Sequence, residues 1–237
     1  EEDEPYFDID QLPLGVAQQI ASKMNMRDLG KFAFISDKNL DIAKDPDIRE
    51  TARRNTVIEI VSQNGMRLRD YPQYYNDKEI VLAAVRQNGM SLMYADPVLK
   101  RDRRVVLAAV RNDGKSIEYA SPELVQDREV ILAAVSTNSI AIRYANHVLQ
   151  GDRDFIIDVV SQNGWALAHT SPAFKADREV VLAAVRQNGG AIYFASHTLQ
   201  ADKEIVLAAV RQNGNAIRYV DPELRQDREV IFASLSN

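Results

Sequence analysis

Hydrophobic and polar positions follow one pattern that recurs every 25 residues. In each copy, an Asp and two polar residues precede an apolar run, which closes at Asn-Gly in most copies, as in residues 77–89, 177–189 and 202–214. The apolar side chains fall at helical spacing, and no segment alternates apolar and polar residues as an exposed strand does. The pattern therefore predicts an all-α chain. The recurring aspartates are Asp77, Asp102, Asp127, Asp152, Asp177, Asp202 and Asp227.

Each copy also contains signals for where its helices begin and end. An Asp side chain accepts hydrogen bonds from the free N–H groups at a helix start, and an acid two residues later suits the positive end of the helix dipole. We expect the Gly after Asn to end the helix in a left-handed conformation, with a weaker cap where Ser139 replaces it. A second short helix follows, and then a single-turn third helix that begins at pairs such as Asp96-Pro97.

A helix of about 11 residues is only marginally stable by itself, so the copies must be stabilised by stacking on one another. The Ala-Ala pair in each long helix allows neighbouring axes to approach to about 8–10 Å. We therefore predict an α-solenoid over residues 53–237. It comprises a degenerate first copy (53–76), copies that start at 77, 102, 127, 152, 177 and 202, and a partial copy (227–237). Such arrays usually present a binding surface.

The first fifty residues do not repeat. Residues 1–11 are acidic and are predicted to be a mobile lead, whereas residues 12–50 are predicted to form a compact three-helix segment. A second helix is expected from Asp28 and a third from the pair Asp45-Pro46, which has the form of a cap and first turn. The apolar stripe of the first helix is predicted to consist of Val16, Ile20 and Met24.

The spacing of Leu-Pro, Ile, Met, Asp-Leu and Ile-Ser within residues 12–36 resembles the F-box. The resemblance implies docking on the Skp-type adaptor of a cullin–RING ubiquitin ligase. The motif is degenerate, and three residues depart from it. Gly15 stands where the family usually has an acid, Ala21 replaces a large aliphatic residue, and Asn39 stands near the usual Trp or Phe. The alternative is a plain helical cap with the same residues as its core. The implied adaptor-binding residues are Leu12, Pro13, Ile20, Met24, Leu29 and Ile35.

The repeats themselves resemble a family of short helical repeats of unknown function, whose signature residues 177–189 match throughout. That family is found often in intracellular bacteria and in agents that live in amoebae. Together, the two resemblances imply an effector that a bacterium secretes into the host cytosol to recruit a host ubiquitin ligase. The implied localisation of the chain is cytoplasmic.

Charge and composition narrow the classes of partner. Residues 1–50 hold 12 acids and 6 Lys or Arg, whereas residues 51–237 hold 22 acids and 23 Lys or Arg. A near-neutral array is not expected to bind nucleic acid, which requires basic stripes. No run approaches the length needed to cross a membrane, and the lack of cysteine excludes disulfides and cysteine zinc sites. The aligned arginines form either a ridge or, as we favour, a solvated face of mixed charge: Arg86, Arg111, Arg186 and Arg211.

No catalytic motif is evident. His147 and His197 occupy equivalent positions two copies apart, roughly 20 Å if the copies stack at about 10 Å, which is too far for one metal ion. The chain contains neither a phosphate-binding glycine loop nor a nucleophile elbow. The repeated aspartates are spaced as helix caps and not as catalytic pairs. We therefore expect no enzyme activity, no cofactor and no metal.

Two positions in each copy vary freely: the residue after Gly and the residue three further on, which shares its helix face. A variable face on a constant core is typical of a surface that meets a partner, and exposed Trp and Tyr favour binding. The alternative is ordinary drift of exposed residues, with Trp165 half buried as filler. The substrate-binding candidates are Met90, Met93, Ile140, Arg143, Trp165 and Tyr193.

These patterns lead to one main hypothesis and two others. The first is a substrate-recruiting adaptor of a ubiquitin ligase, whose repeats hold an unknown protein substrate. The second is an interaction scaffold with no link to ubiquitin. A third, which the charge balance disfavours, is an RNA-binding helical repeat.

Overall fold

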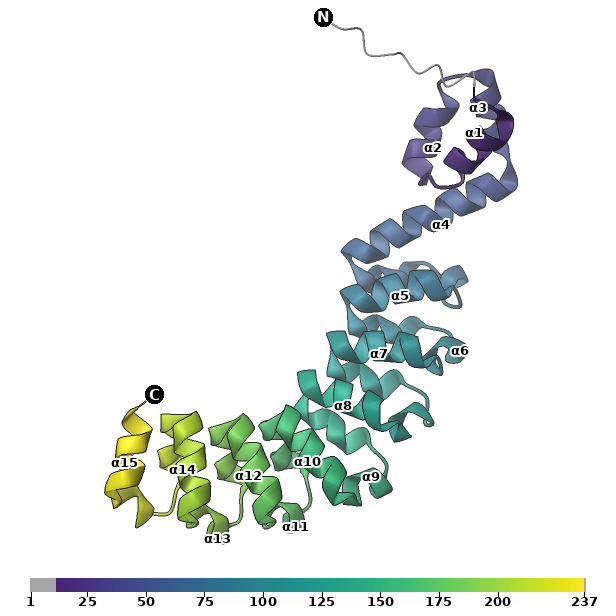
Figure 1. Cartoon of the computed structure of the whole chain (residues 1–237). Coiled ribbons are helices and arrows are strands. Elements are labelled where there is room, and N and C mark those ends of the chain that lie inside the picture. Colours follow the sequence, from purple (N-terminus) through teal and green to yellow (C-terminus); the bar gives the residue numbers. More distant parts are fainter. Residues whose placement is uncertain (1–11, 237) are drawn as a thin grey trace, which may run out of the picture.

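The computed structural model describes residues 12–236, in which the chain is an arc of stacked helices without any strand (Figure 1). The predicted all-α solenoid is thereby confirmed. The expected acidic lead at residues 1–11 lies outside the described residues. The first four helices are α1 (Leu14–Ala21), α2 (Met26–Ala33), α3 (Asp37–Lys44) and α4 (Pro46–Gln63).

Side-chain caps explain where these first helices begin. Asp45 accepts hydrogen bonds from the backbone N–H groups of Asp47 (2.9 Å) and Ile48 (3.2 Å), and Pro46 occupies the first turn, so the predicted cap of this helix is confirmed. The helix expected from Asp28 begins two residues earlier, because the Asn25 side chain caps it. The Ser36-capped helix α3 was not predicted.

The predicted apolar stripe of the first helix does not face the core. Ala17 and Ala21 are fully buried, whereas Val16 and Ile20 are exposed. The third predicted residue, Met24, lies after the end of α1 and packs half-buried against the core. The small alanines let α1 pack closely on its neighbours, and the larger side chains are left on the outer surface. The core of this N-terminal unit (residues 12–52) consists of Ala17, Ala21, Leu29, Phe32, Ile42 and Ala52.

Helix α4 belongs to both parts of the molecule. Its first half contributes Ala52 to the core of the N-terminal unit, and its second half contributes Val57 and Val61 to the core of the repeats. Asn55 Nδ2 donates to the carbonyl oxygen of Met24 (3.0 Å), and Thr56 Oγ1 accepts from the backbone N–H of Met26 (2.8 Å). The boundary placed between residues 50 and 53 therefore falls inside one continuous helix that connects the two parts.

Each repeat contains a long α-helix, a 3₁₀-helix and a single turn. The second helix, which the sequence did not distinguish from an α-helix, is of the 3₁₀ type in every copy described. The long helices are α5 (Lys78–Gln87), α7 (Arg103–Asn112), α8 (Arg128–Thr137), α10 (Arg153–Gln162), α12 (Arg178–Gln187), α14 (Lys203–Gln212) and α15 (Arg228–Leu235). The 3₁₀-helices are η2 (Gly65–Asp70), η4 (Gly89–Tyr94), η5 (Gly114–Tyr119), η7 (Ser139–Tyr144), η8 (Gly164–His169), η9 (Gly189–Phe194) and η10 (Gly214–Tyr219).

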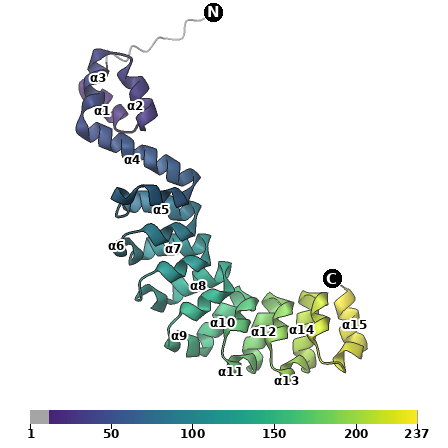
Figure 2. The same cartoon turned by 180° about the vertical axis from the view of Figure 1, so that it is seen from behind.

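The single turns lie along the outer edge of the arc, where α6, α9, α11 and α13 are visible in both views (Figures 1 and 2). The long helices pack side by side, and their buried positions merge into one core that runs from Val57 to Ala233. The turns are η3 (Pro72–Tyr74), α6 (Pro97–Lys100), η6 (Leu124–Gln126), α9 (His147–Gly151), α11 (Pro172–Lys175), α13 (His197–Gln200) and η11 (Leu224–Gln226).

The repeated aspartates have a second role besides capping. Asp177 accepts from the backbone N–H of Glu179 (3.0 Å) and also pairs with Arg153 of the preceding copy, whose Nε lies 2.7 Å from Asp177 Oδ2. The Arg153 hydrogen bond, with help from the backbone N–H of Val180, holds the pKa of Asp177 below its ordinary value of 3.8 despite partial burial. One such pair spans every joint: Arg54–Asp77, Lys78–Asp102, Arg103–Asp127, Arg128–Asp152, Arg153–Asp177, Arg178–Asp202 and Lys203–Asp227.

The expected left-handed glycine cap is wrong. No glycine in residues 12–236 has a positive φ, and the preceding Asn is extended, as at Asn88 (φ −147°, ψ 109°). The Gly is required by close approach instead, because a Cβ on Gly89 would lie 2.3 Å from the carbonyl oxygen of Ala109 in the next long helix. The Gly89 N–H donates to Asn112 Oδ1 of that same helix (2.7 Å). The weaker cap expected at Ser139 therefore has no left-handed turn to act on.

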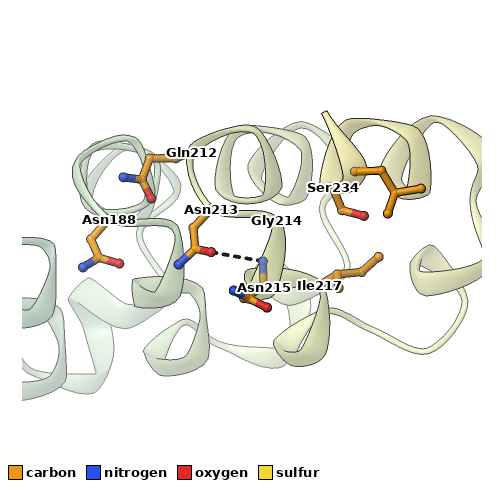
Figure 3. Close-up of a pocket in the computed structure, with 8 residues that line it drawn as sticks. Asn188, Gln212, Asn213, Gly214, Asn215, Ile217 and Ser234 are labelled. Carbon is orange, nitrogen blue, oxygen red and sulfur yellow. Dashed lines mark hydrogen bonds between the residues drawn. The ribbon is translucent and has the colours of Figure 1, made fainter. Parts of the chain in front are cut away.

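In the copies after the first, the Asn or Asp that ends the long helix also caps the following 3₁₀-helix, whereas Asn64 in the degenerate first copy makes no such bond. At the joint between α14 and α15, Asn213 Oδ1 accepts the backbone N–H of Asn215 (3.0 Å; Figure 3). Gly214 approaches Ser234 there as the other glycines approach alanine. The Asn-Gly pair thus joins two helices within a copy and holds that copy against the next.

Candidate functional site

An apolar groove on the surface of the N-terminal unit is the strongest candidate site. It has a volume of about 320 Å³ and a lining that is almost wholly apolar. Asp28 and Lys31 stand at its rim, with 3.7 Å between the Lys31 Nζ and an Asp28 carboxylate oxygen. We call this the N-terminal groove; its apolar lining consists of Leu12, Ile20, Met24, Phe32 and Ile35.

Residues from separate elements converge on this groove. Leu12 precedes α1, and its carbonyl oxygen accepts a hydrogen bond from Lys38 of α3. Ile20 comes from the outer side of α1, and Met24 from the link to α2. Ile35 follows the end of α2 and is exposed. Leu12 and Met24 are half-buried and also pack against the core, whereas Ile20 and Ile35 are exposed to solvent.

The six residues implied by the F-box resemblance therefore divide into two sets. Two lie away from the groove lining: Leu29 is buried in the core, and Pro13 is exposed at the start of α1. The other four line the N-terminal groove together: Leu12, Ile20, Met24 and Ile35.

Sequence reasoning missed several apolar residues around the groove. Phe34 is 94% exposed, and Leu40 is also exposed. A second hollow contains Phe34 and Leu40 and shares Ile35 with the N-terminal groove. Phe34 lies two residues after the buried Phe32, on a different side of the helix end, which is the signal that could have revealed it. Exposed apolar surface of this kind is typical of protein-binding sites.

A second candidate surface lies on the 3₁₀-helices of the array. A 3₁₀-helix has three residues per turn, so the variable positions three apart lie on one side of it. Five of the six candidates are exposed, and Met90 is half buried. The exposed five are Met93, Ile140, Arg143, Trp165 and Tyr193.

Aromatic rings connect part of this surface. The ring centroids of Trp165 and Phe194 are 5.7 Å apart, and those of Tyr193 and Phe194 are 5.1 Å apart. The ring centroids of Tyr193 and Tyr219 are 5.0 Å apart. All three of these ring pairs meet edge to face. We call these four residues the aromatic cluster. Trp165 and Tyr193 stood out in the sequence as variable positions, but Phe194, which brings them together, did not.

Trp165 is held in place by a neighbouring glycine. A Cβ at Gly190 would lie 3.3 Å from the Trp165 ring, so the bare backbone there leaves room for the indole. The Trp165 side chain remains 46% exposed. It therefore packs on the next copy and still exposes part of its ring to solvent.

The remaining chemical candidates do not assemble into a site. No group of three or more His, Asp or Glu side chains in residues 12–236 is arranged to hold a metal ion. Burial, assisted by the positive charges of Arg143 and Lys175, lowers the pKa of His169, which favours its neutral form. The hollow between α14 and α15 contains mainly amide side chains such as Asn213, which is already engaged in capping (Figure 3).

Comparison with known proteins identifies the repeats. Residues 77–125, 127–175, 177–225 and 202–237 match the family model described as Domain of unknown function (DUF4116). These matches cover more than half of the chain, so the chain belongs to this family. Each of the first three matches spans two of the 25-residue copies.

The other comparisons gave no relative. No curated protein and no solved structure is significantly similar to the chain. The family matches begin at residue 77 and give no support to the F-box resemblance of residues 12–36. Among the described helices, none is both long and apolar enough to cross a membrane.

Proposed function

We propose that this chain is a non-catalytic adaptor that connects two other proteins. The N-terminal unit docks on one partner through its groove, and the repeat array holds the second. One observation carries the proposal: Leu12, Ile20 and Ile35 come from separate segments and line a single apolar groove open to solvent. A helical unit whose only task was to cap the array would gain more stability by burying these side chains.

The F-box resemblance supports a specific first partner, the Skp-type subunit of a cullin–RING ubiquitin ligase. Four of the six residues that the resemblance implies line the groove. In this proposal the array holds a protein substrate for ubiquitination, and partner subunits supply the chemistry. The family resemblance of the repeats further supports a bacterial effector that acts in the host cytosol.

Helix α4 supports an adaptor in which the relative position of the partners is fixed. Asn55 and Thr56 bond the link between α1 and α2, and Asn25 Nδ2 donates to Glu59 at 2.8 Å. On the side of the repeats, the hydroxyl of buried Tyr74 in η3 donates to Glu50 Oε1 in the first half of α4 (2.8 Å). Burial and the Glu50 carboxylate raise the pKa of Tyr74 to about 12, so the phenol keeps its donor proton. These bonds hold the groove at a set orientation to the repeats.

The aromatic cluster supports the second binding surface. Tyr193 is 57% exposed and lies between Phe194 and Tyr219, with Trp165 on the other side of Phe194. Exposed Trp and Tyr contribute a large share of the binding free energy at protein interfaces. We expect the substrate to contact this cluster.

A binding assay with a purified eukaryotic Skp-type subunit tests the first half of the proposal. Ile20→Asp and Ile35→Asp place a charge in the N-terminal groove, which should weaken the complex by about tenfold or more, since burying an unpaired charge costs at least 1.4 kcal/mol. Both residues are exposed, so the helical circular-dichroism signal should not change.

The matched control is Val98→Asp, which adds the same charge to an exposed apolar residue of the array. It should leave Skp binding unchanged. Failure of the intact chain to bind any Skp-type subunit would remove the ubiquitin link and leave an interaction scaffold. Tyr193→Ala should weaken capture of the substrate and preserve Skp binding, which separates the two surfaces.

A further inference from the structure

One copy of the repeat departs from the charge pattern of all the others. The second position after the cap is acidic in each complete copy except one, and in that copy it is Arg104. Glu129, Glu179 and Glu204 at this position each pair with the base of the preceding copy. At the α5–α7 joint, Lys78 pairs with Asp102 alone, and Arg104 places a positive charge where the other joints have a negative one.

Arg104 lies in a groove between the long helices α5 and α7, which we call the α5–α7 groove. The groove has a volume of about 520 Å³, and Leu82, Leu107 and Ala108 provide its apolar lining. Arg86, Arg104 and Arg111 supply its charges, and the lining contains no acid. The groove therefore carries a charge of +3 over an apolar floor.

Two of these arginines lack an ionic partner. Arg111 Nη2 is 3.3 Å from Glu129 Oε1 and is partly neutralised. Neither Arg86 nor Arg104 forms an ion pair with any of residues 12–236, although both are exposed. An anion that entered the groove would therefore meet positive charge without having to break an existing salt bridge.

The equivalent groove between α12 and α14 gives an internal comparison. It has the same design, with Leu182, Leu207 and Ala208 as its apolar lining and Arg186 and Arg211 on its sides. The position of Arg104 is occupied there by Glu204, so the charge is +1 in place of +3. The two grooves differ chiefly in this one side chain.

We propose that the α5–α7 groove binds an acidic peptide segment that also carries an aliphatic side chain. The arginines would engage carboxylates, and the aliphatic group would rest on Leu82 and Leu107. A groove between helix axes about 8–10 Å apart takes an extended segment of only a few residues. This inference does not depend on the N-terminal groove or its partner.

A nucleic acid fits this surface less well than an acidic peptide. Phosphate backbones are bound by long basic stripes, but the positive charge here is confined to one groove. Glu79 and Glu129 stand at the same helix position on either side, and the whole chain has a net charge of −5. A short acidic segment touches the arginines and avoids these acids.

The test is fluorescence anisotropy with the full chain and a labelled peptide of about eight residues, roughly 27 Å when extended. The peptide contains Asp and Glu around a central Leu, and its control has Asn and Gln in place of the acids. The acidic peptide should bind, and its affinity should fall with salt. Arg104→Glu should weaken binding about five- to tenfold, because an attraction is exchanged for a repulsion.

Glu204→Arg is the converse variant and should create a second site of similar affinity. Each variant only installs a residue type that another copy carries, so the helical signal of the chain should be retained. The proposal would be overturned if Arg104→Glu left the affinity unchanged, or if the amide peptide bound equally well. Single-stranded RNA that bound as tightly as the peptide, with the same sensitivity to Arg104, would overturn it in favour of a nucleic-acid site.

Discussion

The N-terminal unit and the repeat array are both built from short helices, but they place their apolar residues differently. In the array, each long helix buries its large aliphatic residues against the next, as Ile80 and Val81 do. In the N-terminal unit, Phe34 and Ile35 lie on the surface, and the fully buried Asn39 has no hydrogen-bond partner for its side chain. The long helices of the array bury their large aliphatic side chains between copies, whereas the N-terminal unit leaves large apolar side chains beside its small core on the surface.

A pair of phenylalanine variants tests this difference between the two regions with the largest expected effect. Phe155 is fully buried in the array core, so Phe155→Ala should lower the free energy of unfolding by about 3–5 kcal/mol. Phe34→Ala, on the exposed residue, should change it by no more than about 0.5 kcal/mol. Urea titration followed by circular dichroism measures both. Similar losses for the two variants would show that Phe34 is part of a core and would contradict the distinction.

A pair of glycine variants tests the close approach between copies. A Cβ on Gly189 would lie 2.2 Å from the carbonyl oxygen of Ala209, so Gly189→Ala should cost about 2–3 kcal/mol of stability. Gly15 lies within α1 with nothing within 4 Å of its added Cβ. Gly15→Ala should therefore stabilise the N-terminal unit by about 0.5–1 kcal/mol, because Ala favours helix. Thermal unfolding of both variants gives the sign of each change, and a neutral Gly189→Ala would contradict the packing role.

A third pair of variants, with smaller expected effects than Phe155→Ala and Gly189→Ala, tests the polar groups buried in the two regions. Replacing Asn39 with Leu removes two buried polar atoms that lack partners, so Asn39→Leu should raise the free energy of unfolding by about 1 kcal/mol. The matched control is Ser116→Ala in the array, where the buried hydroxyl donates to the carbonyl oxygen of Asp113 (2.7 Å). That change should lower stability by about 1 kcal/mol. A destabilised Asn39→Leu chain would indicate that Asn39 has a role in holding the fold.

Local signals predicted a large part of this structure. The Asp caps and the Asp45-Pro46 start were read correctly because a cap depends on one side chain and the two or three residues after it. The left-handed glycine was wrong for the converse reason. The carbonyl that excludes a side chain at Gly89 belongs to Ala109, twenty residues away, and only packing brings it near.

The candidate sites show the same division. Trp165 and Tyr193 stood out as variable positions, but their contact through Phe194 depends on how neighbouring copies stack. Ile20 and Ile35 were named from a motif, but the motif does not say whether they are exposed. The structure shows that Ala17 and Ala21 fill the core and leave Ile20 and Ile35 on the surface. The α5–α7 groove was likewise hidden, since Arg86 and Arg104 belong to different helices.

The sequence by itself determined that this protein is a repeated helical array with its own caps, because the 25-residue period and the helix signals are local and appear in every copy. Only the tertiary structure decided which surfaces remain open. Whether an apolar or charged side chain is covered depends on the neighbouring helix, and that neighbour is fixed by the packing of whole copies and not by the residues beside it in the chain.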